Sequence, residues 1–172
     1  MYKFLPIFKS TIWGGTSIAP FKGAVAAQSQ IGESWEISGV KDCESIVAEG
    51  PEAGLTLSEL IMAHGESLLG RKVMKRYGTE FPLLVKFIDA RQDLSVQVHP
   101  NDQQAAARHN GSRGKTEMWY VVNATSDAHL CSGFKRNITA EEYCKAIEDG
   151  SIVEMLAEYN VKPGDLFFLP AG

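Results

Sequence analysis

The stretch Leu94-Ser95-Val96-Gln97-Val98-His99-Pro100 says most about the fold, and a related run follows at Glu117-Met118-Trp119-Tyr120-Val121-Val122. Residues that favour β-strands dominate the second run. Gln97 and His99 are two positions apart, so their side chains would leave the same face of a strand. Because Glu117 opens the second run, two adjacent strands would bring an amide, an imidazole and a carboxylate together. The two runs therefore predict strands that carry a metal site.

Short strand-like runs separated by Gly, Pro and Asp recur along the chain and predict a barrel or sandwich. They cover residues 34–38, 83–89, 94–98, 118–122 and 166–169. The turn Pro163-Gly164-Asp165 is suited to feed the last of them, because proline fixes φ and glycine permits positive φ. No repeat and no clear linker interrupts the pattern, so we expect a single domain over residues 1–172.

Helices are expected at two places where the sequence has the pattern of a capping box. One box is Thr56-Leu57-Ser58-Glu59, and the other is Thr139-Ala140-Glu141-Glu142. Apolar residues at Leu57, Leu60, Ile61, Leu68 and Leu69 give the first helix a buried stripe. We expect a third short helix over residues 102–108.

Composition indicates a globular protein that acts on small molecules or proteins. The chain has 172 residues, 44% of them hydrophobic, and a formal net charge of −4, which gives no electrostatic reason to bind nucleic acid. We find no secretion signal and no apolar stretch of the roughly 20 residues that a membrane span needs, so we expect a cytoplasmic protein. Cys43, Cys131 and Cys144 show no C-x-x-C spacing and are expected to be reduced thiols.

Further motifs agree with the metal-site runs in order along the chain. They are Trp13-Gly14-Gly15, Gly32-Glu33-Ser34-Trp35-Glu36-Ile37-Ser38, Phe81-Pro82-Leu83-Leu84-Val85-Lys86-Phe87-Ile88-Asp89-Ala90 and Val161-Lys162-Pro163-Gly164-Asp165-Leu166-Phe167-Phe168-Leu169-Pro170-Ala171-Gly172. Together they resemble type I phosphomannose isomerase (mannose-6-phosphate isomerase), a zinc enzyme of the cupin superfamily, and most closely its short bacterial branch. The resemblance implies a mainly β, cupin-type jelly roll with two or three short helical insertions. It also implies a sugar-phosphate substrate and the interconversion of mannose 6-phosphate and fructose 6-phosphate in mannose metabolism.

By the same resemblance, Gln97, His99 and Glu117 are three of the zinc ligands. The family's fourth ligand is a histidine shortly after Pro-Ala-Gly, and the sequence here ends at Gly172. We therefore expect an N-terminal part of the enzyme, with the jelly roll incomplete at its C-terminus, weak metal binding and little activity alone. The other histidines are expected to be solvated or capping residues: His64, His109 and His129.

Lys115 is the candidate catalytic residue. Aldose–ketose isomerisation moves a proton between adjacent carbons and needs an acid/base group beside the metal. Lys115 is two positions before Glu117, so it would project to the same side if the strand extends back that far. The alternative is a solvated loop lysine.

Candidate substrate-binding residues are Lys86, Glu36 and Trp13. Lys86 interrupts an apolar run, so its ammonium needs either a carboxylate partner or a place in the sugar-phosphate site. Trp35 is expected on one face of its strand, with Glu33 and Glu36 on the other, near Lys86 or the substrate. Trp13 is expected either to line the pocket or to pack in the core.

A second class of function stays open from the sequence alone, namely a non-catalytic cupin module that binds sugar or metal. The reading frame after Gly172 would distinguish the two classes. A continuation with a histidine and a later arginine favours the enzyme, and a stop codon favours the binding module.

Overall fold

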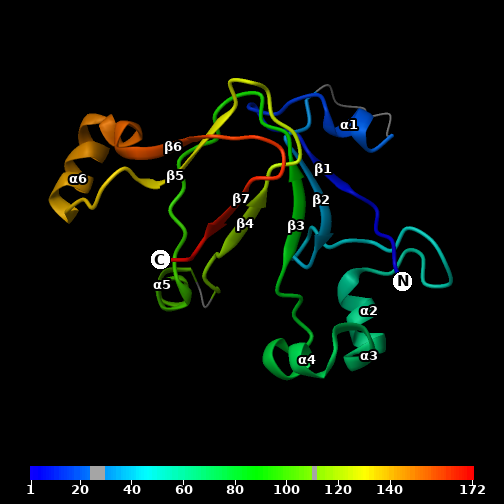
Figure 1. Ribbon diagram of the computed structural model, residues 1–172. Helices are drawn as coiled ribbons and strands as arrows, with labels where there is room; N and C mark the ends of the chain where they lie inside the picture. The colour runs from blue at the N-terminus through cyan, green and yellow to red at the C-terminus, as the bar shows by residue number, and fades with distance from the viewer. Residues whose placement is uncertain (24–29, 110–111) are drawn as a thin grey trace. The chain divides into compact units, whose positions relative to one another are not determined.

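The computed structural model describes residues 1–23, 30–109 and 112–172. The chain folds into two compact units, which comprise Met1–Leu94 and Ser95–Gly172. Figure 1 shows the helices and strands of each unit.

The first unit is built on an antiparallel sheet of three strands (Figure 1). The central strand β2 (Glu33–Ser38) pairs with β1 (Ile7–Lys9) on one side and with β3 (Leu84–Ile88) on the other. Trp35 stands opposite Ile7 on β1 and Lys86 on β3. The predicted strands at 34–38 and 83–89 are thus confirmed.

The described residues of the first unit also form four helices, namely α1 (Ile18–Phe21), α2 (Leu57–His64), α3 (Glu66–Leu69) and α4 (Arg71–Tyr77). The predicted capping box starts α2, where the Thr56 side chain accepts from the backbone N–H of Glu59 and the Glu59 side chain accepts from that of Thr56. Leu57, Leu60 and Ile61 bury the apolar stripe in the core. The apolar stripe does not lie on one continuous helix. Gly65 has a φ of 47°, and this backbone conformation ends α2 before α3 begins.

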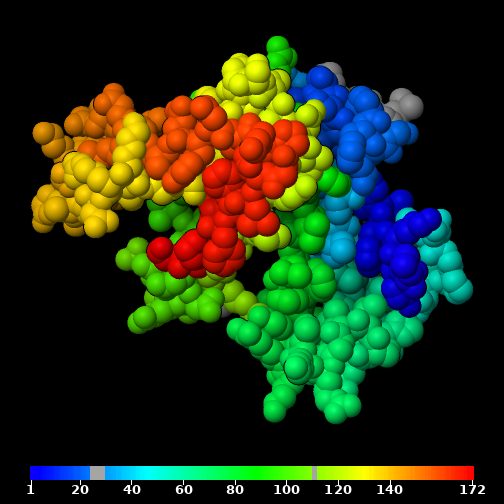
Figure 2. Space-filling model, in the orientation of Figure 1, coloured from blue at the N-terminus to red at the C-terminus, as the bar shows by residue number. Residues whose placement is uncertain are grey.

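Where the structure describes the second unit, residues 95–109 and 112–172, it contains two antiparallel strand pairs (Figure 1). One joins β4 (Glu117–Tyr120) to β7 (Leu166–Leu169), and the other joins β5 (His129–Phe134) to β6 (Leu156–Asn160). The helices are α5 (Asp102–Arg108), α6 (Ala140–Asp149) and the 3₁₀ helix η1 (Ser151–Met155). Figure 2 shows the region of α6, in yellow and orange, as a lobe that projects from the rest of this unit.

Local sequence signals explain several of these elements. The Thr139 capping box begins α6 as predicted, and α5 covers the expected residues after an Asn101 cap. Gly164 has a φ of 97° in the turn before β7, and the Asp165 side chain accepts from the backbone N–H of Lys162 at 2.9 Å. The turn that the sequence predicts there is confirmed.

The predicted strand at residues 94–98 is wrong. Within the described residues, this segment is irregular backbone and joins none of the three sheets. A strand requires a ladder of hydrogen bonds to a neighbour, and strand-favouring residues do not supply the partner. Just after the segment, the His99 carbonyl accepts from the N–H of Gly172 at 3.0 Å.

In the part of the chain that the structure describes, seven strands in antiparallel sheets are consistent with the predicted mainly β class. The expected number of helices is too low, since the described residues form six α-helices and one 3₁₀ helix. The additional breaks come from glycines at positive φ, such as Gly65 and Gly70. Among the described residues, none of these helices has the length and hydropathy required to cross a membrane. All three cysteines are free thiols, as predicted.

Candidate metal centre

Three chain segments of the second unit position the candidate ligands. Glu117 is the first residue of β4 and stands opposite Leu169 on β7. Beyond β7, the backbone of Gly172 donates to the His99 carbonyl, and the backbone of Ala171 donates to the Thr116 hydroxyl at 3.3 Å. The two residues Ala171 and Gly172 thereby link the segment of His99 to the start of β4.

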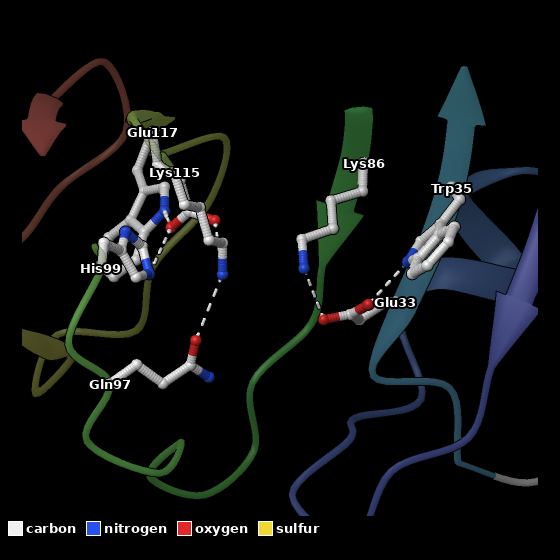
Figure 3. Close-up of polar contacts among 8 residues, drawn as sticks. Glu33, Trp35, Lys86, Gln97, His99, Lys115 and Glu117 are labelled. Carbon is white, nitrogen blue, oxygen red and sulfur yellow. Dashed lines mark hydrogen bonds and ion pairs between the residues drawn. The ribbon is translucent and has the colours of Figure 1, made fainter. Parts of the chain in front are cut away.

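His99 and Glu117 face each other in this arrangement (Figure 3). The imidazole Nε2 of His99 lies 3.7 Å from the carboxylate Oε2 of Glu117, and the two side chains are 11% and 20% exposed. The indole Nε1 of Trp119 donates to the same Oε2 at 3.2 Å. The carboxylate is therefore held from one side by an indole and directed toward the imidazole.

Lys115 connects the remaining candidate to this pair (Figure 3). Its ammonium Nζ lies 3.1 Å from Oε1 of Glu117 and donates to Oε1 of Gln97 at 3.3 Å. The Lys115 side chain is 47% exposed. The structure thus brings together the four residues that the sequence singles out in this unit, although Gln97 lies on irregular backbone rather than on a strand.

The donor set suits a zinc ion. Two ligands bonded to one tetrahedral zinc at about 2.1 Å are separated by roughly 3.4 Å, and the separation of His99 Nε2 from Glu117 Oε2 is 3.7 Å. Within the described parts of the chain, no three side chains of the His, Cys, Asp and Glu types are grouped to hold one metal. A centre built here therefore depends on the amide oxygen of Gln97 in addition to the imidazole and the carboxylate.

Trp119 is a contact that sequence reasoning missed. It donates to the oxygen of Glu117 that faces the imidazole. The spacing contained the signal, because residues two apart on a strand share a face. Trp119 follows Glu117 by two positions within β4.

Lys86 belongs to the first unit, where it forms an ion pair with Glu33 at 2.7 Å (Figure 3). Of the two alternatives that the sequence left open for Lys86, the structure thus contains the carboxylate partner. The other oxygen of Glu33 accepts from Nε1 of Trp35 at 2.6 Å. The expectation that Trp35 and Glu33 lie on opposite faces is wrong, because they are two positions apart on β2 and share one face.

Glu36 and Trp13 also lie in the first unit. The Glu36 carboxylate accepts from Lys22 and from the Ser34 hydroxyl, each at 2.6 Å. The Trp13 ring packs against Gly32, where an added Cβ would lie 2.7 Å from the ring. Both residues therefore have structural contacts, and their predicted part in substrate binding stays a prediction.

Comparisons with known proteins agree with this reading of the motifs. A family model described as phosphomannose isomerase type I, catalytic domain, matches residues 1–137. Mannose-6-phosphate isomerase ManA of Bacillus subtilis (strain 168) is 44% identical over 98% of this chain and 51% of its own length. The chain thus spans about half the length of the curated relatives it matches.

Solved structures of mannose 6-phosphate isomerases also resemble this chain. The crystal structure of the mannose 6-phosphate isomerase from Bacillus subtilis superposes with a TM-score of 0.87 at 35% identity, covering 99% of this chain and 52% of that one. The Salmonella typhimurium enzyme, solved with its substrate f6p and a zinc atom, has a TM-score of 0.73 at 18% identity over 99% of this chain and 64% of that one, and it supports the fold alone. Since the family model covers more than half of the residues and relatives well above 30% identity match nearly all of them, the chain belongs to the type I phosphomannose isomerase family.

Proposed function

We propose that the complete protein containing this chain is a zinc-dependent mannose-6-phosphate isomerase, which interconverts mannose 6-phosphate and fructose 6-phosphate. The observation that carries the proposal is the grouping of Gln97, His99 and Glu117 in a member of this family. Relatives named as mannose-6-phosphate isomerases support the reaction, and the imidazole, carboxylate and amide donors of this chain support the metal.

Gln97, His99 and Glu117 are the proposed ligands from this chain. Bound zinc would supply a Lewis acid that polarises the oxygens of the sugar. Gln97 contributes a neutral oxygen, so the ligand set keeps a low negative charge and leaves more of the charge of the ion for the substrate. The Trp119 indole holds the Glu117 carboxylate in one orientation through its hydrogen bond.

Lys115 is the proposed acid/base group. The isomerisation removes a proton from one carbon of the sugar and returns one to its neighbour, so it needs a side chain that accepts and donates a proton beside the polarised oxygens. Lys115 Nζ contacts two of the proposed ligands, and the Lys115 side chain is about half exposed. An amine in this place can reach a sugar bound at the metal and still exchange protons with solvent.

The finer architecture is also a proposal. We propose that the strand pairs β4–β7 and β5–β6 belong to a cupin-type jelly roll, and that residues 1–172 are the N-terminal part of its single domain. The superposition on about half of the Bacillus subtilis structure supports this assignment. In the same protein we keep Lys86, Glu36 and Trp13 as candidates for binding the sugar phosphate.

The test uses the complete protein, expressed with the sequence that follows Gly172 in its reading frame. Isomerase activity is measured in a coupled assay that starts from mannose 6-phosphate, before and after zinc is removed by chelation and restored. Zinc content is measured by mass spectrometry for the wild type, His99→Ala and Glu117→Gln. His129→Ala is the matched control, because His129 is an exposed histidine of the same unit on β5.

We expect chelation to abolish turnover, zinc to restore it, and His99→Ala and Glu117→Gln to lose both zinc and turnover. His129→Ala should keep both. Lys115→Met should keep zinc but lower turnover by about 100-fold, the effect of losing an acid/base group. Full turnover without zinc, or wild-type zinc content in both ligand variants, would overturn the proposal.

A further inference from the structure

The ammonium of Lys115 has an unusual place among the proposed ligands. It lies 3.1 Å from Oε1 of Glu117 and 3.3 Å from Oε1 of Gln97, so one cation contacts the two oxygen donors of the candidate centre (Figure 3). The second oxygen of Glu117 faces His99 and Trp119. A positive charge therefore already contacts the Gln97 oxygen and the Oε1 atom of Glu117, on the two side chains that would supply oxygen to zinc.

We propose that Lys115 fills the cation position of the metal-free centre, and that zinc binding displaces its ammonium from Gln97 and Glu117. The inference rests on the proposed zinc site and goes beyond the acid/base role. An oxygen bonded to zinc has less electron density to offer a lysine, and the two cations repel each other at short range. Metal and ammonium therefore compete for the Gln97 oxygen and for the negative charge of the Glu117 carboxylate, which meets Lys115 with Oε1 and His99 with Oε2.

The surroundings of Lys115 allow this exchange. Its side chain is 47% exposed, whereas those of His99 and Glu117 are 11% and 20% exposed. The lysine can swing into water at little cost while the less exposed ligands stay in place. Displacement also frees the Lys115 amine from Gln97 and Glu117. Zinc binding would therefore release the proposed acid/base group at the same time.

The sign of the effect on zinc affinity separates two roles for Lys115. A competing cation lowers the affinity of the centre, so Lys115→Met should bind zinc more tightly. A lysine that arranges the ligands for the metal would have the opposite effect. We expect the dissociation constant for zinc to fall about fivefold, the factor that an exposed ion pair contributes.

The experiment measures zinc affinity of the complete protein by competition with a chromophoric chelator. The variants are Lys115→Met, Lys115→Arg and His99→Ala, and Lys135→Met is the matched control. Lys135 is a lysine of the same unit whose ammonium donates to the Glu154 carbonyl at 3.0 Å. Its replacement removes the same charge without touching the proposed ligands.

Tighter binding by Lys115→Met alone, with Lys115→Arg near the wild type, would support the exchange. Equal or weaker binding by Lys115→Met would overturn it, as would an equal gain in Lys135→Met. His99→Ala reports on the zinc site itself. Wild-type affinity in His99→Ala would refute the site, whereas lost affinity there with no gain in Lys115→Met would refute only the exchange.

Discussion

We predict that the ion pair between Lys86 and Glu33 stabilises the first unit, whereas an equally short pair between Lys3 and Glu49 does not do so measurably. Both pairs have an Nζ–Oε1 distance of 2.7 Å. The side chains of Lys86 and Glu33 are 23% and 15% exposed, and those of Lys3 and Glu49 are 70% and 64% exposed. The two pairs therefore differ mainly in their contact with water.

The expected coupling between Lys86 and Glu33 is about 1.5 kcal/mol. Exposed ion pairs contribute roughly 0.2–1 kcal/mol, and breaking a fully buried pair costs about 3–5 kcal/mol, so a mostly buried pair should lie between them. Glu33 also accepts from the indole of Trp35 at 2.6 Å. Glu33→Gln should therefore lower the free energy of unfolding more than Lys86→Met, because it weakens two contacts.

The assay is urea unfolding of the 172-residue chain in two double-mutant cycles. One cycle combines Lys86→Met with Glu33→Gln, and the other combines Lys3→Met with Glu49→Gln. A coupling below about 0.5 kcal/mol for Lys86 and Glu33, or equal coupling in the two cycles, would refute the reasoning from burial. That result would leave a role in sugar-phosphate binding as the better explanation for a lysine in an apolar run.

Three further changes have defined outcomes. Thr139→Ala removes the side-chain cap of α6 and should lower the free energy of unfolding by about 1 kcal/mol. Thr139→Ser keeps a hydroxyl at this position and should retain most of that stability. Gly114→Ala should lower the free energy of unfolding by about 1–3 kcal/mol and weaken zinc binding. The reason is that the added Cβ would lie 2.7 Å from backbone atoms at the start of α5. Unchanged stability would refute this close approach. Hydrogen bonds from Tyr2 and His64 hold the pKa of Glu52 below its ordinary value of 4.5. The stability from this carboxylate is therefore present above that value and lost as the pH falls through the folded pKa, so the unfolding midpoint should drop more steeply in acid for the wild type than for Glu52→Gln.

Elements with their own local chemistry could be predicted from the sequence. The boxes at Thr56 and Thr139 begin helices because a side-chain acceptor and the carboxylate three residues later satisfy backbone donors within one turn. The turn before β7 is predicted from Pro163-Gly164-Asp165, and Gly164 adopts the positive φ of 97° that this turn needs. None of these signals depends on a distant part of the chain.

Features that depend on a partner could not be predicted in the same way. Residues 94–98 have strand-favouring composition, but among the described residues they do not pair with any strand. A β-strand requires hydrogen bonds to a neighbouring strand, and composition alone does not supply that neighbour. The sequence offered Glu33 and Glu36 as possible partners of Lys86 but did not choose between them. The identity of the partner as Glu33 follows from the β2–β3 pairing, in which Trp35 is opposite Lys86 and Glu33 is the next residue on the same face.

The candidate centre combines both kinds of information. The motif singled out Gln97, His99 and Glu117, but their grouping also depends on the two residues Ala171 and Gly172 after β7, whose backbone N–H groups bridge two segments. Lys115 and Trp119 flank Glu117 at a spacing of two, and each contacts a different oxygen of its carboxylate. Because both oxygens have a donor, the carboxylate keeps one orientation toward His99 before any metal arrives. Replacing the cationic donor should thus change how tightly zinc binds, whereas replacing the neutral indole should change how well the ligand is aligned.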